Sequence, residues 1–305
     1  MPRGSATEFV ARVVEAERRG VPRVWTTVGG PTADPVTAYA AAGAATKRIG
    51  LGTAVVPTYP RHPITLAAQA VAIDDLAPGR LRLGVGPSHR PTIEGAYGLP
   101  MGKPLAHLRE YVTILRALLW EGSVDFAGDY FTVKMPLSAG VPTRNIPIPI
   151  SALRTNAFRL AGEIADGAIS WVTPIDYLTQ TALPALQAGA DAAGRARPPL
   201  IAHVPVMVAI DRAAARAAFR AQFPGYAKLP FYAAMFAAAG YPVTPAGEMT
   251  DELVETLAVS GSPDEIRERL EAIRARGLDE LMISLVVVAD EEAELAALSD
   301  ILAGA

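Results

Sequence analysis

The sequence predicts a single parallel β/α barrel of the TIM (β/α)8 type, formed by residues 1–305 as one domain. Short runs rich in Val, Ile and Leu alternate with segments of helical periodicity, which is typical of parallel strands joined by crossover helices. Half of the residues are hydrophobic, enough for a large core. Because no Gly/Ser linker or change of composition divides the chain, one domain is favoured over two.

The first half of the chain alternates helices and strands in a regular order. Strands are expected at Val24 to Val28, Ile49 to Val56, Leu81 to Val85 and Ile146 to Ala152. Helices are expected at Thr7 to Arg19, Pro35 to Thr46, Pro63 to Leu76 and Leu105 to Trp120. Gly128 lies between two Phe-containing arms, and this pattern predicts a hairpin excursion over about residues 122–134.

The second half repeats the alternation around one long insertion. Strands are expected at Gly167 to Val172, Leu200 to Ile210 and Leu281 to Val288, and helices at Ala157 to Ala165, Tyr177 to Ala193 and Glu291 to Leu302. A helical insertion broken by four prolines is expected over about residues 212–257. The helix Ser262 to Arg276 has a cap at Ser262, Pro263 in its first turn and Glu265 at the capping-box spacing.

The strand pattern leaves the barrel one strand short. An eight-stranded barrel needs a strand before the first helix, where only Met1 to Ala6 remain, so this strand is expected to be missing or degenerate, or to lie upstream of the start. A doubly wound sheet is the structural alternative. Its dinucleotide fingerprint is absent, because Gly84 and Gly86 are followed by Pro87 and lack the third glycine.

Composition narrows the class of function. With 28 Lys and Arg against 31 Asp and Glu, the charge of -3 gives no reason to expect a nucleic-acid or acidic-membrane partner. The absence of cysteine excludes disulfides, thiolate catalysis and zinc–thiolate sites, and no metal site is expected. No signal-like start or apolar run of about 20 residues is present, so a cytoplasmic enzyme is expected.

Three segments carry more information than the barrel pattern. They are RIGLGTAVVPTYPRHP from Arg48 to Pro63, PGRLRLGVGPSH from Pro78 to His89, and LAGEIADGA from Leu160 to Ala168. In this order they resemble the luciferase-like monooxygenase superfamily, and more closely its branch of coenzyme F-420-dependent oxidoreductases. The resemblance extends from about Thr7 to the last helix. It is less specific for the cofactor, since members that use flavin mononucleotide (FMN) share most of the same landmarks.

The resemblance implies a cofactor site on the third barrel strand. There, relatives have a non-proline cis peptide that supports the deazaflavin or flavin ring, and the matching residues are Ala54 and Val55; the same run also fits an ordinary buried strand. A phosphate site is implied near the ends of the later strands, with Leu153 and Arg154 where many relatives have small residues. The full expected set is Thr53, Ala54, Val55, Pro57, Arg61, Ser88, Ser151, Ala152, Arg154, Gly167 and Ala168.

Proton transfer is assigned to the end of the fourth barrel strand. His89 follows this strand directly and matches a position that is often acidic in the F-420-dependent branch; a purely hydrogen-bonding loop histidine is the alternative. Relatives often have a histidine after the second strand, whereas this chain has Thr27, which is left as a hydrogen-bonding substitute. His62 is expected to order a loop or contact the cofactor, and His107 and His203 are expected to be structural.

Three functions remain open from the sequence. The first is hydride transfer between coenzyme F-420 and a small organic substrate, by a reductase or a dehydrogenase. The second is an FMN-dependent monooxygenase, and the third is a non-catalytic barrel that binds a cofactor or a partner subunit. A homodimer is expected because relatives commonly dimerise and the apolar composition permits it.

Overall fold

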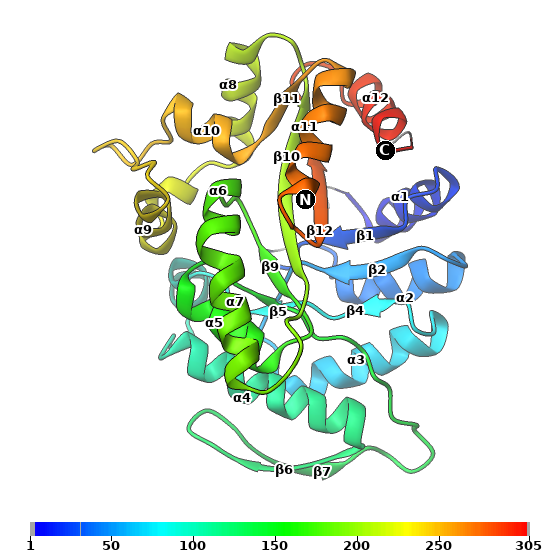
Figure 1. Cartoon of the computed structure of the whole chain (residues 1–305). Helices are drawn as coiled ribbons and strands as arrows, with labels where there is room; N and C mark the ends of the chain where they lie inside the picture. Colours follow the sequence, from blue (N-terminus) through cyan, green and yellow to red (C-terminus); the bar gives the residue numbers. More distant parts are fainter. Residues whose placement is uncertain (1–3, 31, 304–305) are drawn as a thin grey trace. The chain divides into compact units, whose positions relative to one another are not determined.

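The computed structural model describes residues 4–30 and 32–303. Contacts divide the chain into two compact units, which are described in turn (Figure 1). The first unit consists of Met1–Ser151 and Ile164–Gly167, and the second consists of Ala152–Glu163 and Ala168–Ala305. The organisation of residues 1–305 as one domain therefore stays a prediction.

The strands of the first unit are short and all parallel, apart from one hairpin. β1 (Arg23–Thr26) pairs with β2 (Gly50–Thr53), which pairs with β4 (Leu81–Arg82). β3 (Val56–Pro57) pairs with β5 (Val85–Gly86), which pairs with β8 (Ile150–Ser151). The predicted strands at Ile49 to Val56 and Leu81 to Val85 are thus each divided in two. The first division falls at a cis peptide between Ala54 and Val55.

The first three helices of the first unit begin after residues whose side chains cap them. Figure 1 shows α1 (Ala6–Arg18), α2 (Pro35–Ala45) and α3 (Pro63–Leu76) beside β1, β2 and β4. Ser5, Asp34 and His62 cap these helices through their side chains. The predicted helix Leu105 to Trp120 is α4 (Pro104–Arg116) followed by a π-helical turn, Ala117–Glu121. A second π-helical turn covers Pro91–Ala96.

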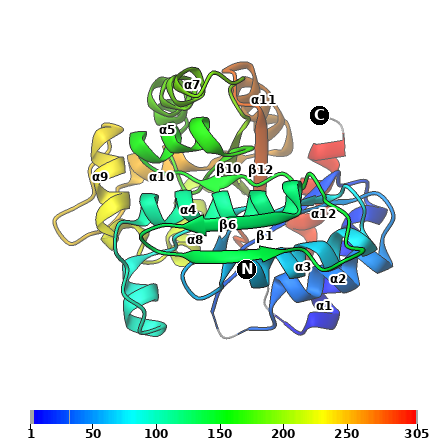
Figure 2. The same ribbon diagram turned by 90° about the horizontal axis from the view of Figure 1, so that it is seen from below.

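The predicted hairpin excursion is confirmed. β6 (Ser123–Ala127) and β7 (Thr132–Pro136) form an antiparallel pair that lies beside α4 in Figure 2. The Glu110 carboxylate on α4 accepts the backbone N–H groups of Asp129, Tyr130 and Phe131 at 2.9 to 3.1 Å. This carboxylate therefore fixes the turn of the hairpin to the helix.

The second unit is arranged around one long strand. β10 (Leu200–Val208) pairs in parallel with β9 (Ala168–Ser170), β11 (Val259–Gly261) and β12 (Glu280–Leu285). The helical elements of this unit are α5 (Thr155–Ile164), α6 (Ile175–Tyr177), α7 (Leu183–Ala192), α8 (Arg212–Gln222), α9 (Pro230–Ala238), α10 (Asp251–Leu257), α11 (Pro263–Ala275) and α12 (Glu291–Ala303), with turns at Leu178–Ala182 and Tyr226–Lys228. α8, α9 and α10 lie within residues 212–257, where the helical insertion was expected, and the capping box of α11 is confirmed. β11 is a strand that the sequence pattern missed.

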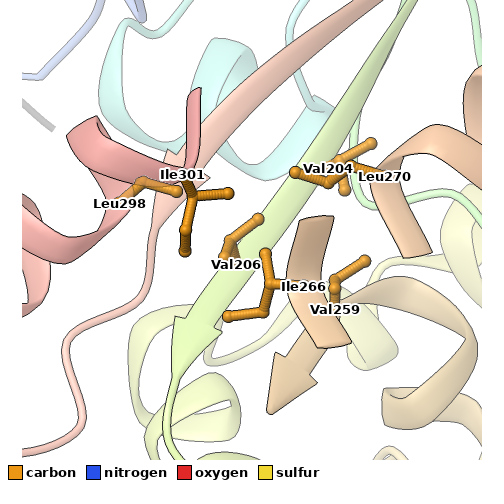
Figure 3. Packing of buried hydrophobic residues seen from close by; sticks show 7 residues of the cluster. All are labelled: Val204, Val206, Val259, Ile266, Leu270, Leu298 and Ile301. Atoms are coloured by element: carbon orange, nitrogen blue, oxygen red, sulfur yellow. The ribbon is translucent and has the colours of Figure 1, made fainter. Parts of the chain in front are cut away.

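The core of the second unit shows which face of β10 meets the helices. Val204 and Val206 of β10 pack against residues of β11, α11 and α12 (Figure 3). The cluster consists of Val204, Val206, Val259, Ile266, Leu270, Leu298 and Ile301. Because successive side chains of a strand point to opposite faces, His203 and Pro205 project from the other face of β10, away from these helices.

Two expectations concern the ends of the chain and membranes. The missing first strand would fall within Met1 to Ala6, of which residues 1–3 lie outside the described residues; Gly4 and Ser5 lead directly into α1. A degenerate first strand therefore stays a prediction.

Within residues 4–30 and 32–303, no helix is both long and apolar enough to cross a membrane.

Candidate active site

A pocket opens in the first unit where β1 and β3 end. Its volume is about 190 Å³, and its walls come from the segments that follow these two strands and from Tyr97. The lining residues are Val28, Gly29, Gly30, Thr32, Asp34, Pro35, Pro57, Pro60, Arg61 and Tyr97. Barrel enzymes keep their chemistry at the carboxyl ends of the strands, so the pocket lies where an active site is expected.

Arg61 and Asp34 form a half-buried ion pair in the wall of this pocket. Nη2 of Arg61 donates to Oδ1 of Asp34 at 3.1 Å, and the two side chains are 21% and 31% exposed. Burial raises the pKa of Asp34, but hydrogen bonds from Thr37 and Arg61 outweigh it and leave the pKa below its ordinary value. Asp34 is therefore ionised at neutral pH while it also caps α2.

A second group of predicted site residues meets around Gly86, at the end of β5. A Cβ atom added to Gly86 would lie 2.2 Å from Oγ of Ser151 and 2.8 Å from Cγ2 of Val55. The Thr53 hydroxyl donates to the Gly84 carbonyl at 2.8 Å. The structure thus brings Val55 and Ser151 together over the backbone of Gly86, and it has the cis peptide at Ala54–Val55 that the resemblance implied.

His89 lies on the loop that follows β5, and it is not among the residues that line the pocket. Its side chain is half-buried, and this burial lowers the pKa of the imidazole. Ser88 before it has a φ of 63°, in the left-handed region. The His89 carbonyl accepts the N–H groups of Thr92 and Ile93 at the start of a π-helical turn. This turn ends at Tyr97, which lines the pocket.

The other predicted residues of the first unit are Thr27, Pro57 and Gly167. Thr27 precedes the pocket wall, and its carbonyl accepts the Thr26 hydroxyl at 3.3 Å. Pro57 lines the pocket and lies 3.9 Å from the position of a Cβ on Gly29. The Gly167 carbonyl accepts the Ile150 N–H in strand pairing. No contact of Thr27 or Gly167 marks either residue as a binding group.

The remaining histidines of the first unit have local contacts. Nδ1 of His62 accepts the Ile64 N–H at 3.3 Å and caps α3, as the expected loop-ordering role requires. The His107 ring stacks on Tyr59 at 3.9 Å and lies 3.3 Å from the Thr58 hydroxyl. Burial lowers the pKa of His107 to about 4. A structural role for His107, as the sequence predicted, fits this packing.

Ala152, Arg154 and Ala168 belong to the second unit. The Ala152 N–H donates to Ile169 and the Ala168 N–H to Pro199, both at 2.9 Å, and both side chains are buried. Their amides are therefore used in strand pairing, and a phosphate would need other donors. Arg154 is exposed before α5, where it could act only through its side chain. Their roles in cofactor binding stay predictions.

Of the residues that line the pocket, only Pro57 and Arg61 were among those predicted from the sequence; Asp34 and Tyr97 are two of those that were missed. Asp34 directly precedes a proline that begins a helix, and this cap signal was available in the sequence. Tyr97 had no signal, because a helical turn of unpredictable form carries it to the pocket. Within the described ranges, no group of three or more His, Cys, Asp or Glu side chains is arranged to hold a metal ion.

The α/β fold with its parallel strands matches solved structures of the TIM-barrel type. An F-420-dependent secondary alcohol dehydrogenase in complex with an F-420–acetone adduct superposes with a TM-score of 0.82, at 19% identity, over 97% of this chain and 94% of its own. A type II Baeyer–Villiger monooxygenase from Pseudomonas putida in complex with FMN superposes with a TM-score of 0.72, at 18% identity, over 98% and 92%. At these identities the likeness concerns the fold alone.

The sequence comparisons settle the family. The profile of the luciferase-like monooxygenase family matches residues 2–280, so the chain belongs to this family. An uncharacterized protein of Mycobacterium bovis is 30% identical over 97% of this chain and 96% of its own length. An F-420-dependent glucose-6-phosphate dehydrogenase of Nakamurella multipartita is 35% identical over 62% of this chain and 59% of its own length.

Proposed function

We propose that this protein is an oxidoreductase that transfers a hydride between coenzyme F-420 and a small organic substrate. The observation that carries the proposal is the position of His89, half-buried after β5 on the loop that leads to the pocket. The names of the Nakamurella relative and of the alcohol dehydrogenase structure support F-420 as the cofactor.

The residues around Gly86 are proposed to lie beside the ring of the cofactor. Val55 and Ser151 approach the Gly86 backbone so closely that no larger residue would fit there, and Thr53 is fixed by its hydroxyl on the Gly84 carbonyl. Thr53, Ala54, Val55, Ser88 and Ser151 are therefore proposed to hold the ring of the cofactor. A bound deazaflavin supplies the hydride or accepts it. Arg61 is available for an anionic group of the cofactor or of the substrate.

His89 is proposed to handle the proton that accompanies the hydride. Because burial lowers its pKa, the imidazole is neutral at neutral pH and can accept a proton from a hydroxyl being oxidised. In the opposite direction, the protonated ring would donate this proton to the carbonyl oxygen of the substrate being reduced. Thr27 is proposed to orient the substrate by a hydrogen bond from its hydroxyl, since it immediately precedes the wall of the pocket.

An FMN-dependent monooxygenase is the second candidate. The structural likeness to the FMN-bound Baeyer–Villiger monooxygenase supports it, because the same fold accommodates that cofactor. The two candidates share the ring site and differ in the cofactor and in the need for oxygen. A non-catalytic barrel that binds a cofactor or partner subunit is the third.

Fluorescence titration of the purified chain with F-420 and with FMN separates these candidates. We expect saturable micromolar binding of F-420, and binding of FMN that is at least tenfold weaker. Micromolar binding of FMN without a response to F-420 would contradict the proposal. Tight F-420 binding without turnover of any enone, imine or alcohol in a substrate panel would favour the non-catalytic barrel.

We also propose that the protein acts in the cytoplasm as a homodimer. The support for this is the apolar composition and the absence of a spanning helix in the described ranges. Light scattering of the purified chain should give twice the mass of 32.0 kDa. A mass of one chain at micromolar concentration would contradict the homodimer.

A further inference from the structure

We propose that the pocket at the carboxyl ends of β1 and β3 binds a carboxylate group of the substrate, with the guanidinium of Arg61 as its partner. This inference rests on the proposed function only in taking the bound acid to be the substrate. It assigns Arg61 to the substrate and not to the cofactor, and it defines the substrate as a small organic acid with a short apolar body.

Arg61 is held in place from two sides. The hydroxyl of the buried Tyr111 donates to the Arg61 carbonyl at 2.8 Å, which fixes the backbone at the start of α3. Asp34 binds Nη2 at 3.1 Å and so fixes one edge of the guanidinium. A side chain oriented in this way loses little further freedom when it binds a ligand.

The guanidinium of Arg61 has capacity that the protein does not use. Among the described residues, Nη1 is enclosed and has no hydrogen-bond partner. Leaving a charged donor enclosed and unpaired costs free energy, so a ligand oxygen that pairs with it is favoured. The side chain remains 21% exposed and lines the pocket. We expect a carboxylate in the pocket to pair with this guanidinium and to supply the partner that Nη1 lacks.

The charge of the site favours a carboxylate over a phosphate. Asp34 stays ionised and lies against Arg61, so the pair is neutral before a ligand binds. A singly charged carboxylate can share Arg61 with Asp34, whereas a doubly charged phosphate is repelled more strongly by the Asp34 carboxylate. Among the described residues that line the pocket, Arg61 is the one basic residue.

The rest of the pocket fits a short apolar body. Val28, Pro35, Pro57 and Pro60 contribute apolar groups, and Gly29 and Gly30 leave room by having no side chain. A volume of about 190 Å³ lies below that of pockets for drug-sized ligands, which begin at roughly 300 Å³. A four-carbon acid satisfies both the charge and the size.

The ring residues around Gly86 are a separate set. Val55 and Ser151 approach Gly86 and do not line this pocket, which shares only Pro57 and Arg61 with the cofactor-binding residues expected from the sequence. The first unit therefore has two separate sets of residues. We propose that the set around Gly86 binds the cofactor and that the pocket with Arg61 binds the substrate.

The test is binding of crotonate to the full chain without cofactor, followed by ligand-observed NMR. We expect crotonate to bind and crotonamide, which has the same shape without the charge, to bind at least tenfold more weakly. Arg61→Gln should weaken crotonate binding at least tenfold, and Arg61→Lys should recover part of it. Arg12→Gln removes an exposed guanidinium from α1 and should leave binding unchanged.

Asp34→Asn provides a test in the opposite direction. Asparagine still caps a helix, so α2 should keep its start while the competing charge is lost. We expect crotonate to bind severalfold more tightly to this variant, and methyl phosphate, which the wild type should bind weakly, to gain still more. Circular dichroism of each variant confirms that the chain is folded before binding is compared.

Two results would overturn the carboxylate site. One is crotonate binding that is absent or is the same in wild type and in folded Arg61→Gln. The other is tighter binding of methyl phosphate than of crotonate by the wild type, which would assign the pocket to a phosphate. Because no cofactor is present, crotonate binding can succeed even if the F-420 titration fails, and the two proposals are judged separately.

Discussion

His89 in the first unit and His203 in the second unit both lie on or directly after a strand, yet their surroundings differ. His203 is 1% exposed, its Nε2 lies 2.8 Å from Oγ of Ser284, and its Nδ1 accepts the Val172 N–H at 3.4 Å. Its ring stacks on Trp171 at 3.7 Å. His89 is half-buried on a loop that leads to the pocket.

The difference concerns what each imidazole can do with a proton. The Val172 N–H fixes Nδ1 of His203 as an acceptor, so Nε2 carries the hydrogen and donates to Ser284. His203 therefore cannot act as a base toward Ser284, although the two side chains lie at the distance of a catalytic pair. Burial lowers the pKa of His203 to about 3, which keeps it neutral. The histidine within β10 is thus structural, and the histidine that follows β5 is the candidate catalytic one.

His89→Ala should give the largest effect, on turnover. Loss of a general acid or base costs about 100-fold or more in rate, so kcat should fall by this factor. F-420 affinity should change less than threefold, because the ring is proposed to bind around Gly86. Steady-state kinetics and a fluorescence titration of the same preparation check both. Unchanged turnover would remove His89 from the mechanism.

The pH profile of kcat/KM provides a second test of His89. In the direction of substrate oxidation the neutral ring is needed, so activity should fall as pH drops through the lowered pKa, below 6.5. The acid limb should vanish in a His89→Gln variant that retains some activity. An acid limb that persists unchanged would assign the titration to another group.

His203→Ala should affect stability. Removal of the ring leaves a cavity and unpairs both the Ser284 hydroxyl and the Val172 N–H, at a cost of about 3 kcal/mol in the free energy of unfolding. Urea denaturation measures this loss. Ser284→Ala is the matched control, with an expected loss of about 1 kcal/mol for one hydrogen bond. Equal losses for the two variants would contradict the packing role of the ring.

Acid should destabilise the second unit through His203 without any substitution. Below pH 6.5 the unfolded chain binds a proton at this position, whereas the folded chain does not until about pH 3. The unfolded state then holds more protons, so the free energy of unfolding falls as pH falls, by up to about 1.4 kcal/mol per pH unit from this group. The slope between pH 6 and 4 should be smaller in a folded His203→Gln variant. A slope that does not change would place the acid sensitivity elsewhere, for example at His107.

The smallest expected difference is in the free energy of unfolding, between the variants Arg116→Gln and Arg61→Gln. Nη2 of Arg116 donates to both carboxylate oxygens of Asp166 at 2.8 and 2.9 Å, and Asp166 also accepts the Ile148 N–H. We expect Arg116→Gln to lower the free energy of unfolding by about 2 kcal/mol, and Arg61→Gln by about 1 kcal/mol or less. Urea denaturation of both variants measures these losses. A larger loss for Arg61→Gln than for Arg116→Gln would indicate that the ion pair of Arg61 with Asp34 has a structural role.

The sequence predicted best those elements whose ends are marked by local chemistry. α3 begins and ends at the predicted residues, because His62 and Pro63 define its start. The strand at Ile49 to Val56 was predicted as one, whereas the structure has two short strands, β2 and β3, on either side of Ala54 and Val55. β11 was missed because a strand of three residues between helices has too little alternation to be detected.

The candidate site was predicted where a residue follows a strand directly, and less well elsewhere. Arg61 and His89 were identified from their positions after strands, and Val55 and Ser151 from the resemblance to the family. Tyr97 was missed because it reaches the pocket through a π-helical turn, which has no sequence pattern of its own. Strand pairing of the Ala152 and Ala168 amides likewise depends on register, which a single sequence does not define.

Anaerobic turnover tests the central claim most directly. The full chain is mixed with reduced F-420 and a panel of small unsaturated or carbonyl acids, and in parallel with oxidised F-420 and hydroxy acids. The account predicts a change in the deazaflavin spectrum for at least one acid, with formation of the hydride-transfer product at the same rate with and without oxygen. Turnover that occurs only with reduced FMN and oxygen, and that adds an oxygen atom to the substrate, would contradict it.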